Sequence, residues 1–146
     1  MAYLIDTDTI IFALRGDSNV LAKFKENKNL PISISLITYA ELVFGAKRSQ
    51  NEQKNMIKVN HIRDIYPIEK LNEGVMEVFA DIKAKMFDKG IRIEDMDLLI
   101  AATAIYNELT LVTNNTKHFE NVPNLKIENW KNYTRKLNLI HHKKSP

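Results

Sequence analysis

Short apolar runs alternate along this chain with longer segments whose apolar residues recur every three or four positions. A short apolar run that stops at polar residues is typical of a buried strand, and the longer spacing is typical of an amphipathic helix. The expected strands are Ala2–Ile5, Ile32–Ser35, Ile65–Ile68, Leu109–Thr113 and Lys126–Glu128. The first helix is expected to begin near Thr9. The other expected helices are Asn19–Glu26, Thr38–Arg48, Glu52–Ile62, Asn72–Lys89 and Asp95–Asn107, with a short helix inside Asn114–Asn121. This alternation predicts an α/β fold, a three-layer α/β/α sandwich with a mainly parallel central sheet.

Several residues predict where these elements begin and end. Ser18 stands where a helix N-cap is expected, and Gly90 is expected to stop the long helix before it. Pro67 cannot donate a ladder hydrogen bond, which places the third strand at an edge or a strand end. The segment Asp95–Asn107 is apolar nearly all round after its first three residues, so we expect a helix buried on more than one face.

The chain has 146 residues, the usual size of one domain with one hydrophobic core. It contains no cysteine, which excludes disulfides and thiolate-bound zinc and fits a reducing cytoplasm. Asp6 and Asp8 come too early for the apolar stretch of a signal peptide, and no apolar run approaches the length of a membrane span. We therefore expect a cytoplasmic protein without a membrane partner.

Positive charge is concentrated at the C-terminus. The net charge is +3, but the last 16 residues carry +5 and no acid, which leaves −2 on the rest. The basic residues are Lys131, Arg135, Lys136, Lys143 and Lys144. We therefore divide the chain into a domain over 3–130 and a basic tail over 131–146. Such a tail can attract nucleic-acid phosphates, and improved solubility explains it about as well.

Acidic residues fall where the predicted strands end and the following helices begin. Asp6 and Asp8 follow the first strand, Glu41 lies in the first turn after the second, and Asp97 opens the buried helix. Parallel sheets place their ligand sites at this edge, so these acids are candidate site residues. Asn114 and Asn115 follow the fourth strand and belong to the same edge.

Each acid also has a purely structural explanation. Asp6 or Asp8 can cap the helix near Thr9, and Asp95 can cap the buried helix. Thr38 and Glu41 match the T-x-x-E capping box, in which the glutamate bonds back to a backbone amide. These explanations leave open why the acids gather at one edge, where carboxylates repel one another unless a cation joins them. Two aspartates and one glutamate suit a hard divalent ion, Mg²⁺ or Mn²⁺, which commonly serves phosphate chemistry.

Four segments together resemble the successive motifs of the PIN-domain family, from Tyr3 to about Trp130. They are Asp6-Thr7-Asp8, Ile37 to Gly45, Asp97 to Ala102 and Leu111 to Phe119. The T-N-N sequence after the fourth strand and the element Glu128-Asn129-Trp130 are similar to VapC toxins that cut initiator transfer RNA.

This resemblance implies a metal-dependent endoribonuclease, the toxin of a VapBC toxin–antitoxin module. It implies that Asp6, Glu41 and Asp97 hold Mg²⁺ or Mn²⁺, that an activated water attacks the phosphodiester, and that initiator transfer RNA is a candidate substrate. It also implies a VapB-type antitoxin, whose C-terminal segment enters the acidic groove, and a homodimer. Asn115 is assigned to the catalytic set because it stands where many members have a fourth acid.

Asn115 is the main departure from the family pattern, since an amide ligates a cation less strongly than a carboxylate. We therefore expect one tightly bound ion, with Asp8 or Asp95 as residues that can compensate. His118 lies in a polar turn without the spacing of a metal ligand, so it is not among the candidates.

Two other functions are compatible with part of the sequence. Asp6 to Ile10 nearly matches the D-x-D-x-T/V motif of haloacid-dehalogenase-type phosphatases, with Asp6 as nucleophile and Asp8 as acid. The chain offers no evident cap insertion or phosphate-binding lysine for that chemistry. The second alternative is a non-catalytic PIN-like scaffold that binds RNA or protein, and the three retained acids argue against it.

Overall fold

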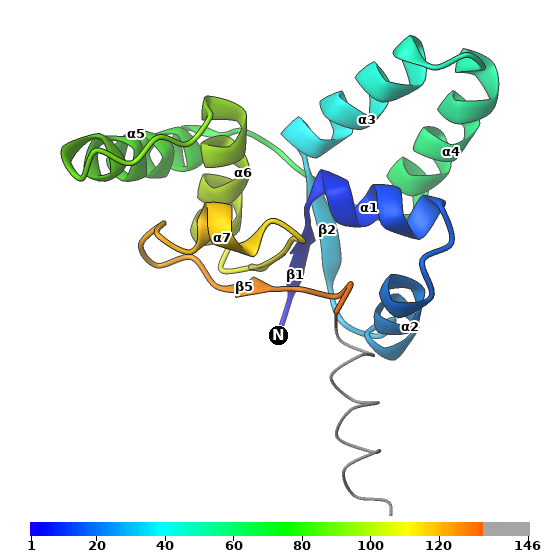
Figure 1. The fold of residues 1–146 in the computed structure, drawn as a ribbon, viewed down its shortest axis with the longest axis horizontal. Helices are drawn as coiled ribbons and strands as arrows, with labels where there is room; N and C mark the ends of the chain where they lie inside the picture. Colours follow the sequence, from blue (N-terminus) through cyan, green and yellow to red (C-terminus); the bar gives the residue numbers. More distant parts are fainter. Residues whose placement is uncertain (133–146) are drawn as a thin grey trace, which may run out of the picture.

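A five-stranded parallel sheet forms the centre of the computed structural model, which describes residues 1–132 (Figure 1). The strands are β1 (Tyr3–Ile5), β2 (Ile32–Ser35), β3 (Ile68–Glu69), β4 (Thr110–Val112) and β5 (Ile127–Glu128). The helices are α1 (Thr7–Leu14), α2 (Ser18–Glu26), α3 (Leu36–Arg48), α4 (Glu52–Ile65), α5 (Glu73–Asp88), α6 (Asp95–Tyr106) and α7 (Thr116–Phe119). The strand order is β3-β2-β1-β4-β5, so the predicted parallel α/β architecture is confirmed.

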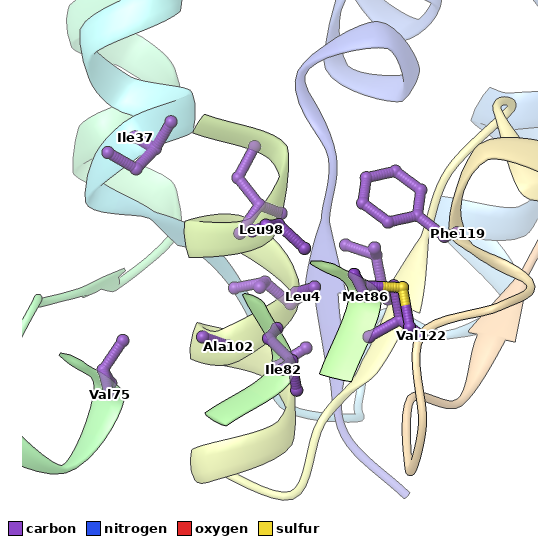
Figure 2. Close-up of a cluster of buried hydrophobic side chains, with 13 residues drawn as sticks. Leu4, Ile37, Val75, Ile82, Met86, Leu98, Ala102, Phe119 and Val122 are labelled. Atoms are coloured by element: carbon purple, nitrogen blue, oxygen red, sulfur yellow. The ribbon is translucent and has the colours of Figure 1, made fainter. Parts of the chain in front are cut away.

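Two hydrophobic clusters cover the two faces of the sheet. Successive side chains of a strand point to opposite faces, and in β1 this sends Leu4 into one cluster and Tyr3 and Ile5 into the other. The Leu4 cluster includes buried residues of α5, α6 and α7 (Figure 2). The Tyr3 cluster includes buried residues of α1, α3 and α4. The molecule therefore has the three layers expected from the sequence.

The central position of β1 explains where a site can form. β1 pairs with β2 on one side and β4 on the other, with Leu4 opposite both Ser33 and Leu111. Because all strands run the same way, their carboxyl ends meet at one edge of the sheet. The segments that begin α1, α3 and α7 leave the sheet at this edge.

The boundary between α4 and β3 differs from the prediction. The helix continues to Ile65 instead of ending at Ile62, and the strand is Ile68–Glu69 instead of Ile65–Ile68. Pro67 explains this, because a residue before proline disfavours the helical conformation, and Tyr66 is extended with ψ 129°. β3 lies at the sheet edge, as predicted.

Helix starts also differ from the prediction in three places. α2 is capped by Asp17 and not by Ser18: the Asp17 carboxylate accepts from the amides of Asn19 and Val20, both at 3.1 Å. α1 begins two residues before Thr9, at Thr7, and α3 begins two residues before Thr38, at Leu36. In each helix, the side chain that accepts a hydrogen bond from an amide of the first turn determines where the helix begins. These side chains belong to Asp6, Asp17 and Ser35.

The long helix and the buried helix were predicted closely. α5 ends at Asp88, and Gly90 adopts a left-handed φ of 69° just beyond it. α6 buries side chains all round, including Leu98, Ile100 and Ala101.

Of the predicted basic tail, only Lys131 and Asn132 are described, so the remainder lies outside the described residues. Within residues 1–132 no helix is long and apolar enough to cross a membrane.

Candidate metal centre

Asp6 stands at the carboxyl end of the central strand and is buried, with 7% of its surface exposed. It caps α1, since its Oδ1 accepts from the Thr7 amide at 2.8 Å. Its Oδ2 accepts from the Thr113 hydroxyl at 2.8 Å. Asp6 is therefore the cap of α1, and its carboxylate is also buried at the sheet edge where the site was predicted.

The protein environment disfavours the ionised form of Asp6. Burial, followed by repulsion from Asp8, raises the pKa of Asp6 to about 7, and Asp97 adds a smaller repulsion. The hydrogen bonds from Thr113 and Thr7 lower it and only partly offset the rise. Burial also raises the pKa of Asp8, with a contribution from Asp97. Asp6, Asp8 and Asp97 thus lie close enough to repel one another.

Asp8 is connected to the segment after β4. Its Oδ2 accepts from the Asn114 amide at 3.1 Å, and its Oδ1 accepts from the Thr9 hydroxyl at the same distance. The carboxylates of Asp6 and Asp8 therefore both bind the segment 113–114, which holds the first turn of α1 against the end of β4.

Glu41 does not form the capping box that was its structural explanation. Ser35 caps α3, with its hydroxyl accepting from the Thr38 amide at 2.9 Å. The Glu41 Oε1 instead accepts from the Thr7 hydroxyl at 2.7 Å. Thr7 Oγ1 also lies 3.0 Å from Thr38 Oγ1, and because its one proton is given to Glu41, the Thr38 hydroxyl donates in that contact. Glu41 thus points toward Thr7, the first residue of α1.

Asp97 lies in the first turn of α6, whose N-cap is Glu94 without a side-chain hydrogen bond. Asp95 is therefore not the cap of this helix, and that structural explanation does not hold. Asp95 instead pairs with Lys83 at 2.9 Å on the surface. Asp97 Oδ2 lies 2.9 Å from Nε2 of His118.

Asn115 occupies the N-cap position of α7, and its side chain makes no capping hydrogen bond. Its backbone amide donates to Thr113 Oγ1 at 3.1 Å, the hydroxyl that also binds Asp6. Asn115 is therefore connected, through its backbone and Thr113, to the sheet edge that carries Asp6, Asp8 and Asp97. We call this the acidic edge.

The chemistry of these donors fits a hard divalent cation. The carboxylates of Asp6, Asp8 and Asp97 repel one another, and a cation between them relieves that repulsion. Within residues 1–132 no three Asp, Glu or His side chains are arranged as a complete ligand set. Asp97 and Glu41 are each engaged with a neighbouring side chain, His118 and Thr7.

Two residues at this edge, Thr38 and His118, were not predicted as site residues from the sequence. Thr38 was considered only as part of a capping box, and His118 was set aside because it lacked ligand spacing. His118 follows Asn115 by three residues, a spacing that places two side chains on one side of a helical turn. That spacing was the available signal.

Comparisons with known proteins identify the family to which this chain belongs. The PIN domain family pattern matches residues 3–125. Ribonuclease VapC2 of Rickettsia felis is 33% identical over 132 residues, covering 89% of this chain and 98% of the relative. The tRNA(fMet)-specific endonuclease VapC of Salmonella typhimurium is 32% identical over 135 residues, with the same coverages.

A solved structure shares the fold as well. The crystal structure of VapBC2 from Rickettsia felis bound to a promoter DNA fragment superposes with a TM-score of 0.85. The identity is 32%, and the match covers 89% of this chain and 99% of the solved one. These matches set aside the phosphatase alternative, and they extend over the whole acidic edge from Asp6 to Asn115. This chain belongs to the PIN domain family, in the group of VapC ribonucleases.

Proposed function

We propose that this protein is the endoribonuclease toxin of a VapBC-type module and that it hydrolyses transfer RNA with Mg²⁺ or Mn²⁺. The observation that carries the proposal is the buried carboxylate of Asp6 at the carboxyl end of the central strand, with Asp8 two residues on and Asp97 of α6 close enough to repel it. The named ribonucleases among its relatives support the same activity.

We propose that Asp6, Glu41 and Asp97 hold the cation, with Asp8 as the nearest further carboxylate. PIN-domain nucleases depend in general on a divalent metal. When bound, such an ion polarises the scissile phosphodiester, lowers the pKa of water and stabilises charge on the phosphoryl oxygens. Asp6 is the anchor of the set because two hydrogen bonds fix both of its oxygens.

The other polar residues of the edge keep these carboxylates in position. Thr113 holds Asp6, and the pair Thr38 and Thr7 holds Glu41. Asn115 is exposed beside them, and in its role as the fourth residue of the catalytic set it adds a neutral oxygen or amide donor toward the substrate. The substitution of an amide for an acid favours one tightly held ion.

We propose a VapB-type antitoxin as the partner. A groove of about 290 Å³ lies between α1, α3 and α4, with Glu41 in its wall. Apolar lining residues include Ile11, Leu14 and Val59. An amphipathic segment that buries apolar side chains there and brings a basic side chain to Glu41 has the matching chemistry. A homodimer and a location in the reducing cytoplasm, which suits a chain without cysteine, complete the proposal.

The test is cleavage of initiator transfer RNA by the purified protein with Mg²⁺ or Mn²⁺. We expect EDTA to stop cleavage and excess cation to restore it. Asp6→Asn and Asp97→Asn should reduce cleavage to background, because each removes a negatively charged ligand without changing side-chain size.

Asp17→Asn is the matched control, because Asp17 is also an aspartate at a helix N-cap but lies outside the acidic edge. It should cleave at the wild-type rate. Equal cleavage by all variants, or cleavage that survives EDTA, would refute the proposal. An elongator transfer RNA run in parallel shows whether the substrate is the initiator species.

A further inference from the structure

The contact between His118 and Asp97 joins two elements that the hydrophobic core holds in place. Asp97 precedes Leu98, and His118 precedes Phe119. Leu98 and Phe119 are 2% and 1% exposed and belong to the same core cluster (Figure 2). Asp97 and His118 are therefore each adjacent to a residue that the core holds in place, and their 2.9 Å contact joins two packed helices.

The imidazole ring is held on a second side as well. Its centroid lies 5.2 Å from that of Phe119, with the rings at 82°, an edge-to-face arrangement. The His118 amide donates to the carbonyl of Asn115 at 3.1 Å, which closes the turn that carries the ring. The ring is thus oriented by its own helix as well as by Asp97.

The chemistry of the two groups limits the direction of this hydrogen bond. A carboxylate that carries its negative charge can only accept, so in that form Asp97 Oδ2 accepts from the N–H of His118 Nε2. The second oxygen, Oδ1, has no hydrogen-bond partner among the described residues. One oxygen of Asp97 is therefore held by the protein, while the other is left for a ligand on the acidic edge.

We infer that His118 is a positioning residue that orients Asp97 as a ligand for the divalent cation. This inference rests on the proposed function, and it adds a residue that the comparisons and the four family motifs do not assign a role. Carboxylates that ligate metals are commonly oriented by hydrogen bonds from neighbouring side chains, and loss of such a partner typically weakens metal affinity.

The test is the affinity for Mn²⁺ measured by isothermal titration of the purified protein in the absence of RNA. His118→Ala should weaken Mn²⁺ binding by about 10- to 100-fold, with little change in the thermal unfolding midpoint. His118→Gln should restore most of the affinity, because its Nε2 offers a donor at nearly the same distance from the backbone. His118→Asn places its donor nearer the backbone and should not restore it.

Lys117→Ala is the matched control, because Lys117 is an exposed residue of the same helix, and the hydrogen bond and ion pair of Asp97 are made by His118. It should bind Mn²⁺ like the wild type. Unchanged affinity in His118→Ala would overturn the inference, and so would tighter binding, which would mean that His118 competes with the cation. Failure of the wild type to bind Mn²⁺ would refute the proposed metal site itself, together with this role for His118.

Discussion

Folding makes Asp6 harder to ionise, because burial and the charge of Asp8 both act against its negative form. Its pKa rises from an ordinary 3.8 to about 7. A carboxyl whose pKa is raised by folding favours the native state while it is protonated. Its contribution to stability is therefore lost as the pH rises from about 4 to about 7.

Asp6→Asn removes this pH dependence because asparagine does not ionise. The unfolding free energy of the variant minus that of the wild type should increase by about 2 to 3 kcal/mol as the pH rises from 5 to 8. Urea denaturation in EDTA at each pH measures this difference. Asp17→Asn should behave in the opposite sense, because the hydrogen bond from Lys131 lowers the pKa of Asp17. Asp17 stabilises the fold above its unfolded pKa and loses this effect in acid. A pH-independent difference for Asp6→Asn would contradict the electrostatic account.

Two buried threonine hydroxyls also act at the scale of single residues, because they hold the acidic side chains in position. Thr113 is fully buried and gives its proton to Asp6, and Thr38 is fully buried and supports Thr7. A buried hydroxyl without a partner costs free energy, so each is satisfied by the site it supports. The residues that position the acids thus also satisfy the hydrogen-bonding needs of the core.

At the scale of elements, the packing of α5 on α6 sets where Asp97 lies. Gly74 stands in the first turn of α5 against the ring of Tyr106, the last residue of α6. A Cβ at position 74 would collide with that ring, so a larger residue there must displace the Tyr106 side chain, while the backbone angle of Gly74 is not unusual. Glycine within a helix is otherwise unfavourable relative to alanine.

A double-mutant cycle tests this contact. In the background Tyr106→Ala, Gly74→Ala should stabilise the protein by about 1 kcal/mol, the usual helix propensity gain. In the wild-type background the gain should vanish or reverse, because the Tyr106 ring must move. Urea denaturation of the four proteins measures the coupling. Equal effects of Gly74→Ala in both backgrounds would show that the two residues do not interact.

At the scale of the whole molecule, Trp130 joins the end of the described chain to its beginning. It is 1% exposed and packs edge-on against Tyr3 of β1 and Phe24 of α2, with ring centroids 5.2 and 5.0 Å apart. Its Nε1 donates to Glu128 Oε1 at 3.1 Å. The segment after β5 is thereby fastened to the centre of the sheet.

Trp130→Ala should cost about 3 to 5 kcal/mol of unfolding free energy, the usual loss for a large buried aromatic residue. Trp130→Phe should cost less, since it keeps a ring against Tyr3 and Phe24. Lys131→Ala is the neighbouring control: it removes a pair with Asp17 at 2.8 Å that is partly exposed, and should cost about 1 kcal/mol or less. A loss for Trp130→Ala no larger than that of the control would contradict the packing seen here.

The order and type of the elements could be predicted from the sequence because they depend on local patterns. Apolar runs, three-to-four spacing and, for α7, a polar turn indicated all five strands and the seven helices that the structure describes, with errors of a few residues at their ends. Those ends depend on which nearby acceptor reaches the free amides, as Asp17 does in place of Ser18. The gathering of Asp6 and Asp97 near one edge also followed from the sequence, since parallel strands end on the same side.

What the sequence alone determined is which residues are acidic and on which ends of strands and helices they stand. The tertiary structure alone decided what each of them touches: Glu41 turns to Thr7 instead of capping its helix, and Asp97 meets His118. These contacts join residues 34 and 21 positions apart. A local pattern carries no information about such pairs, because their geometry is set by how α3, α6 and α7 pack around the sheet.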